Sequence, residues 1–105
     1  MIVEIRTYKV KPGLRDRFVR FFEEEAAPVQ RKTGMVLLGP FIDLGSDDTV
    51  VCLRGFPTHQ DREQMRTLFY KSPEWTGRLR PQAVELLENY KVMVAETGID
   101  TFQYK

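Results

Sequence analysis

Two arginines and one tyrosine are the residues of this chain whose types and spacing favour a binding site. Arg6 and Tyr8 alternate with other residues in the strand-like segment 2–10, and Arg54 lies in a second such segment at 49–56. Because successive side chains of a strand point to opposite faces, Arg6 and Tyr8 share one face. Two guanidinium groups on a concave face favour an anionic ligand such as a carboxylate, and a tyrosine can donate a hydrogen bond or a proton.

The same arginines also suit a structural role. The carboxylates of Glu4, Asp43 or Glu96 can neutralise them across neighbouring strands. A buried charge pair of this kind needs no ligand. The sequence leaves the pocket and the structural pairing as two open alternatives.

Three further side chains are candidates with two readings each. Tyr8 and His59, the single histidine, are the candidate catalytic groups, and His59 could act as an acid or base. His59 begins an expected helix, however, where exposure is common. Tyr70 and Trp75 flank a break between two helices. They can form an aromatic wall over the mouth of a pocket, or a plug that packs the following helix down. No phosphate-binding loop, paired-carboxylate motif or Ser/His/Asp order is present in the sequence.

Composition excludes several classes of protein. The 105 residues suit one domain, 1–105, with 16 basic against 15 acidic side chains, and this balance argues against nucleic acid as a partner. One cysteine, Cys52, excludes an internal disulfide, and with one histidine it cannot form a usual zinc site, so we expect no metal and no cofactor. We see no secretory segment after Met1 and no membrane-length apolar run, which predicts a cytoplasmic protein without membrane contact.

The elements that must position these residues follow from periodicity and from turn residues. Pro28 predicts a kink or a break in the first helix, Gly34 predicts its end, and Gly39-Pro40 predicts a bulged edge strand. Thr58 and Ser72 are expected caps, and Met65, Leu68 and Phe69 the buried stripe of the second helix. The expected strands are 2–10, 35–44, 49–56 and 90–96. The expected helices are 14–32, one from 58, and short ones from 72 and 81. In the tail that follows, Ile99, Phe102 and Tyr104 can dock on a surface.

This order predicts an α+β, ferredoxin-like βαββαβ sandwich with an antiparallel sheet. The first and third strands are then central neighbours, and helices cover one face only. We assign the apolar or small residues to the helix side: Val3, Ile5 and Thr7 in the first strand, with Val51, Leu53 and Gly55 in the third. Arg6, Tyr8 and Arg54 then lie on the uncovered face.

The chain resembles the NIPSNAP family of the dimeric α+β barrel superfamily. The resemblance covers nearly all of the chain up to the last strand. It rests on Glu4-Ile5-Arg6-Thr7-Tyr8 with Pro12-Gly13, on Leu53-Arg54-Gly55-Phe56-Pro57, and on Phe69-Tyr70, Ser72-Pro73 and Trp75. It implies that two subunits pair sheet to sheet as a homodimer, which would cover the open face and place Arg6, Tyr8 and Arg54 in or near an interior cavity.

The superfamily includes cofactor-free monooxygenases of polyketide or quinol-like aromatics, haem-degrading enzymes, and small lyases or isomerases. His59 does not match the haem ligand, so the resemblance disfavours haem. From the residues together with the resemblance, we expect binding of a small anionic or carbonyl-bearing molecule by Arg6, Tyr8, Arg54, Tyr70 and Trp75. The expected reaction class is a cofactor-free monooxygenation or an isomerisation. The alternative is a non-catalytic dimeric module for protein interaction.

Overall fold

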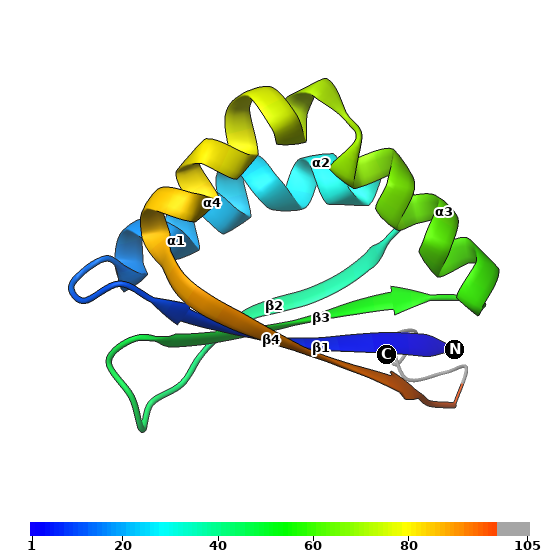
Figure 1. The fold of residues 1–105 in the computed structure, drawn as a ribbon. Helices are drawn as coiled ribbons and strands as arrows, with labels where there is room; N and C mark the ends of the chain where they lie inside the picture. The colour runs from blue at the N-terminus through cyan, green and yellow to red at the C-terminus, as the bar shows by residue number, and fades with distance from the viewer. Residues whose placement is uncertain (99–105) are drawn as a thin grey trace.

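The helices of residues 1–98 lie over one face of a four-stranded antiparallel sheet (Figure 1). The computed structural model describes residues 1–98, so the docking expected of Ile99, Phe102 and Tyr104 lies outside the described residues. The elements are β1 (Ile2–Val10), α1 (Arg15–Phe21), a π-helical turn (Phe22–Ala26), α2 (Ala27–Lys32), β2 (Val36–Ile42), β3 (Thr49–Phe56), α3 (His59–Tyr70), a second π-helical turn (Trp75–Leu79), α4 (Arg80–Leu86) and β4 (Leu87–Glu96).

The sheet has the strand order β2-β3-β1-β4, which confirms the predicted ferredoxin-like arrangement with β1 and β3 at the centre. The register places Glu4 of β1 directly opposite Arg54 of β3. On the other side of β1, Tyr8 lies opposite Tyr90 of β4. Residues opposite each other in an antiparallel pair point to the same face, so these four side chains share one side of the sheet.

The edge strand β2 is interrupted where the sequence predicts it. Its pairing with β3 shifts between Leu38 and Phe41, around the cis Gly39-Pro40 peptide. Gly39 has a φ of +109°, a left-handed conformation that residues with a side chain rarely adopt. Because proline donates no ladder hydrogen bond, the bulge is accommodated at the edge of the sheet.

The predicted helix ends are confirmed, with one difference inside α3. Thr58 Oγ1 accepts the Asp61 N–H at 3.1 Å, and Ser72 Oγ accepts the Trp75 N–H at 3.1 Å. Pro28 is taken up without a break, because a π-helical turn directly precedes α2. Leu68, predicted in the buried stripe of α3, is 61% exposed, so that assignment is wrong.

The sheet face that lies under the helices is the opposite of the one we expected. The Tyr8 ring packs against Phe18 of α1 with 5.3 Å between centroids, and the Arg54 guanidinium lies over the Phe69 ring of α3 at 5.7 Å. Val51 and Leu53, predicted to face the helices, therefore point away from them, as do Gly55, Val3, Ile5 and Thr7. Arg6, Tyr8 and Arg54 are covered by the chain's own helices and need no second subunit as a lid.

The hydrophobic core lies between this face and the helix layer. Its fully buried members include Val10, Val50, Phe56, Phe69 and Leu79. They come from β1, β3, α3 and the turn before α4, so burial of their side chains, at roughly 25 cal/mol per Å² of apolar surface, holds the two layers together. Among residues 1–98, no helix is long and apolar enough to cross a membrane.

Candidate functional site

A single carboxylate with four arginines around it lies between the sheet and α3. Glu4 is fully buried. Its Oε1 accepts hydrogen bonds from Arg6 Nη1 at 2.9 Å and from Arg54 Nη1 at 3.4 Å. Its Oε2 accepts from Arg62 Nε at 2.8 Å and from Arg66 Nη1 at 3.0 Å. Each oxygen thus receives two charge-assisted hydrogen bonds, which saturates the carboxylate.

The charges of this cluster do not cancel. Burial by itself would raise the pKa of Glu4, but Arg54 and Arg6 outweigh burial and hold that pKa below its ordinary value. Glu4 is therefore ionised at neutral pH and contributes one negative charge against four guanidinium groups. The side chains of Arg62 and Arg66 are 21% and 36% exposed, so water partly solvates their charges. Arg6 and Arg54 are 5% and 2% exposed and face the one buried carboxylate, which leaves one buried positive charge without a partner.

Two tyrosine hydroxyls extend the cluster. Arg6 Nε donates to Tyr8 Oη at 2.8 Å, and Arg54 Nη1 donates to Tyr70 Oη at 2.9 Å. Burial raises the pKa of Tyr8 well above its ordinary value, so the phenol is neutral. Because each hydroxyl oxygen accepts from an arginine, its own hydrogen can be donated to another acceptor. The Cys52 thiol, 3.6 Å from Tyr8 Oη, has a pKa raised by burial and is not an activated nucleophile.

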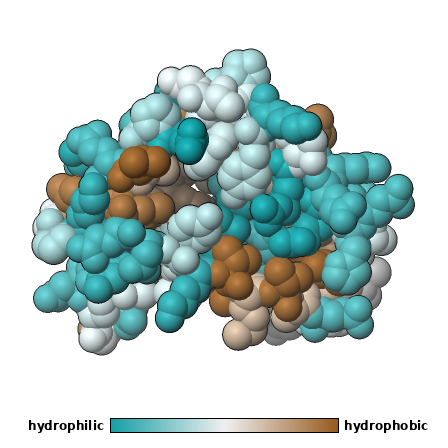
Figure 2. All heavy atoms as spheres, in the orientation of Figure 1, coloured by the Kyte–Doolittle hydropathy of each residue, from teal (hydrophilic) through white to brown (hydrophobic). Residues whose placement is uncertain are grey.

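The tyrosines and arginines border a cavity of about 670 Å³ between the helix layer and the sheet. Figure 2 shows a hollow in this side of the molecule, with hydrophobic side chains on one side of it and a hydrophilic cluster on the other. Glu88, the carboxylate of the described lining, is paired with Lys9 at 3.5 Å. The lining consists of Arg6, Tyr8, Phe18, Phe21, Phe22, Ala26, Gln30, Arg54, Arg66, Tyr70, Trp75, Arg80, Ala83, Val84, Leu87, Glu88, Asn89, Tyr90 and Val92.

Two buried polar atoms of the lining residues have no hydrogen-bond partner among residues 1–98. They are Nε of Arg54, a donor, and Oε1 of Gln30, an acceptor. Gln30 is 3% exposed and belongs to α2 in the helix layer, whereas Arg54 belongs to β3 in the sheet. Buried polar groups in proteins are nearly always satisfied, so an unpaired donor and an unpaired acceptor beside one cavity favour a guest with matching groups.

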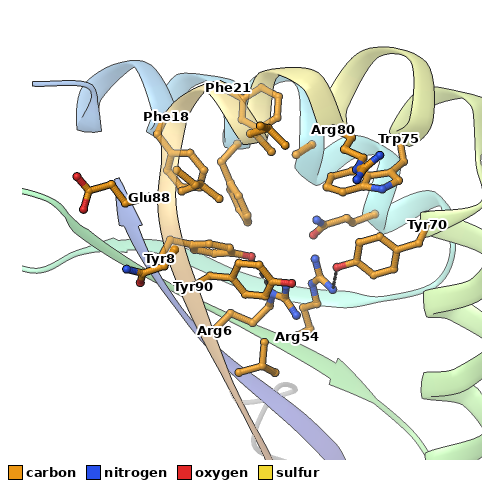
Figure 3. Close-up of a pocket in the computed structure, with 18 of the residues that line it drawn as sticks. Arg6, Tyr8, Phe18, Phe21, Arg54, Tyr70, Trp75, Arg80, Glu88 and Tyr90 are labelled. Atoms are coloured by element: carbon orange, nitrogen blue, oxygen red, sulfur yellow. Dashed lines mark hydrogen bonds between the residues drawn. The ribbon is translucent and has the colours of Figure 1, made fainter. Parts of the chain in front are cut away.

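The structure brings all five predicted ligand-binding residues to this cavity (Figure 3). Arg6 and Tyr8 come from β1, Arg54 from β3, Tyr70 from the end of α3, and Trp75 from the turn that follows. The geometry of Tyr70 and Trp75 is compatible with both readings of this aromatic pair. The Tyr70 and Trp75 rings meet edge to face at 5.1 Å and both contact Phe69, while both also line the cavity.

His59 is not part of the site. It is the exposed first residue of α3 and is absent from the cavity lining. No group of three or more histidine, cysteine, aspartate or glutamate side chains able to hold a metal ion is found in the described part of the chain.

Sequence reasoning missed several polar members of the site, among them Arg62, Arg66 and Gln30. Arg62 and Arg66 are four residues apart on α3, a spacing that puts both on one helix face toward Glu4. Gln30 follows Phe22 and Ala26 at intervals of four, so it is the polar member of a buried helical stripe. A charged pair at this spacing and a polar residue in an apolar stripe are the signals that could have found them.

Comparisons with known proteins agree with this fold. A NIPSNAP-like domain protein from Burkholderia xenovorans is 29% identical, with 93% of this chain and 85% of that chain covered and a TM-score of 0.82. A NIPSNAP family protein of unknown function from Agrobacterium tumefaciens is 25% identical, with 93% and 88% covered and a TM-score of 0.83.

An antibiotic biosynthesis monooxygenase shares the fold at 16% identity, with a TM-score of 0.67 over 93% of this chain and 99% of that chain. No curated protein sequence matches the chain. The model of the NIPSNAP family matches residues 3–96, which include both central strands and every cavity residue described above. The chain therefore belongs to the NIPSNAP family.

Proposed function

We propose that the chain binds a small anionic or carbonyl-bearing molecule in the cavity between its helices and its sheet. The observation that carries the proposal is the excess of buried positive charge beside an apolar space. One carboxylate, Glu4, faces four arginines, and three of these, Arg6, Arg54 and Arg66, also line the cavity. A purely structural ion cluster would be better neutralised, because uncompensated buried charge destabilises the folded state.

The lining gives each part of such a ligand a partner. Arg54 and Arg66 lie near Tyr70, with their guanidinium carbons 5.6 and 5.4 Å from its ring centroid, and form a polar end for a carboxylate or carbonyl oxygen. Tyr8 packs against Phe18 and Phe22, at 5.3 and 6.5 Å between centroids, and begins an apolar end. An aromatic or aliphatic body would lie against these rings, as in ligand sites with apolar walls and few polar groups.

As the reaction class we propose an isomerisation or a cofactor-free monooxygenation, the latter also suggested by the antibiotic biosynthesis monooxygenase that shares the fold. The lining of the described chain contains no histidine, and Glu4 is saturated by arginines. Ionisation of the substrate would therefore be favoured by the positive field, which lowers the pKa of an enol or phenol.

Tyr8 would donate its proton to the substrate oxygen, or stabilise the charge on it. In the oxygenation, a substrate CH2 group and one O2 give a carbonyl and one water, so the substrate itself supplies the electrons. Neither reaction class needs a metal or a bound cofactor.

A panel of aromatic carboxylates and enolisable ketones, ranked by the rise in melting temperature that each causes, tests the binding proposal. We expect hits among the acids, because a ligand that binds only the folded state raises its stability. The hits should lose most of their effect in Arg6→Met and Arg54→Met, and keep it in Arg31→Met, whose exposed arginine is outside the cavity. Equal shifts in all four proteins would contradict the proposal.

We also propose that the chain forms a homodimer through the other face of the sheet. That face carries Val36, Leu38, Phe41 and Met93, of which Phe41 is 50% and Met93 62% exposed. A second copy of the chain is the occupant that the family resemblance implies, and burial of this apolar surface would favour association. A non-catalytic dimeric module would need this face alone, and the charged cavity is the feature that favours a ligand-binding protein instead.

A further inference from the structure

We infer that the preferred ligand of the cavity is a hydroxy acid: an apolar, ring-bearing carboxylate with a hydroxyl group close to the carboxylate. This inference rests on the proposed function and adds the substrate class. It starts from the two unsatisfied atoms, Nε of Arg54 and Oε1 of Gln30, both on residues that line the cavity and are at least nine-tenths buried.

The first of these atoms takes the acid group. Arg54 uses Nη1 for Tyr70 Oη at 2.9 Å and for Glu4 Oε1 at 3.4 Å, and its Nε remains as a buried donor. A carboxylate oxygen is the acceptor that a guanidinium binds most strongly. The Tyr70 hydroxyl, which accepts from Arg54, can donate its hydrogen to the same acid group.

The second atom requires more than an acid. The buried Oε1 of Gln30 has no hydrogen-bond partner within residues 1–98, and as a carbonyl oxygen it can only accept. A bare carboxylate has no hydrogen to donate, so it would leave this oxygen unpaired. A hydroxyl group both donates and accepts and thus satisfies a glutamine amide in either orientation.

Arg54 and Gln30 line the same cavity from its two layers. Arg54 rises from β3 at the centre of the sheet, and Gln30 belongs to α2 in the helix layer above it. The carboxylate would lie toward the sheet and the hydroxyl toward the helices. The rest of the molecule would extend along the Phe18, Phe21 and Phe22 side chains, which line the same cavity.

Two matched pairs of acids test the inference by titration calorimetry at neutral pH. The pairs are mandelate with phenylacetate, and 3-hydroxy-3-phenylpropionate with 3-phenylpropionate, and each differs by one hydroxyl at a different spacing. A site with a buried group that pairs with a hydroxyl rejects the analogue without it. We expect the hydroxy acid of at least one pair to bind tenfold or more tightly than its partner.

The variant Gln30→Met should remove this preference while the hydroxyl-free acid still binds, and Gln60→Met, at an exposed position of α3, should keep it. Should Gln30→Met fail to fold, the two pairs measured on the unaltered protein still decide the question. Equal affinities within both pairs would overturn the hydroxy-acid inference alone. Binding of none of the four acids would overturn the proposed function as well.

Discussion

The two faces of the sheet differ in chemistry and in cover, and the charged face is the covered one. Under the helices lie Glu4, Arg6 and Arg54, all at most 5% exposed. On the other face, Leu38 and Phe41 are apolar and exposed. Charged side chains can be buried when they pair with one another. An exposed apolar face is stabilised when another apolar surface covers it. One sheet thus provides a polar cavity and a surface for association.

The largest effect on this contrast should come from Glu4→Gln. The change leaves four arginines without their shared carboxylate, and breaking a buried charge pair from one side costs about 3–5 kcal/mol. Urea unfolding of the two proteins at pH 7 measures the loss. A difference below about 1 kcal/mol would mean that the cluster is not held by this carboxylate.

The same variant gives a pH dependence of known sign. The pKa of Glu4 is lower in the folded chain than its ordinary value of 4.5, so its stabilisation is complete above that pH. It is lost as the pH falls through the lowered pKa, and the stability gap to Glu4→Gln should then close. As a comparison within the cluster, Arg54→Met should cost less than Glu4→Gln, because it reduces the excess of positive charge.

The second effect concerns the apolar face of the sheet that points away from the helices. Leu38→Glu puts a charge on an exposed apolar position of β2, so it should weaken the proposed dimer at least a hundredfold, about 2.7 kcal/mol. Thr67→Glu, at an exposed site on α3 outside this face, is the control. Sedimentation velocity at micromolar concentration separates monomer from dimer. A monomeric unaltered protein would refute the proposed association directly.

The order of the strands could be predicted from the sequence, but not the side that the helices cover. Gly39-Pro40 identifies β2 as an edge strand, and right-handed connections then place β1 beside β3. Alternation within β1 separates Glu4, Arg6 and Tyr8 from their neighbours, yet it gives two faces of equal standing. The usual preference for apolar cores predicts that the apolar residues face the helices. The pairing of Glu4 with Arg6 and Arg54 allows the charged face to lie there instead.

The site was predictable where residues share a strand and not where they meet across layers. Arg6 and Tyr8 are two residues apart on β1, so their shared face follows from the pleat. The approach of Arg62 and Arg66 to Glu4 spans more than fifty residues of sequence and depends on how α3 lies on the sheet. Such contacts are set by tertiary packing, which a single sequence does not display.

Anion binding by the charged, covered face of the sheet can be followed through the fluorescence of Trp75. Trp75 is the single tryptophan of the chain and lines the cavity beside Tyr70. Titration with phenylacetate should change its fluorescence saturably in the unaltered protein and in Arg31→Met, and the change should be lost in Arg54→Met. A fluorescence response that is identical in all three proteins, or that never saturates, would contradict anion binding by this face.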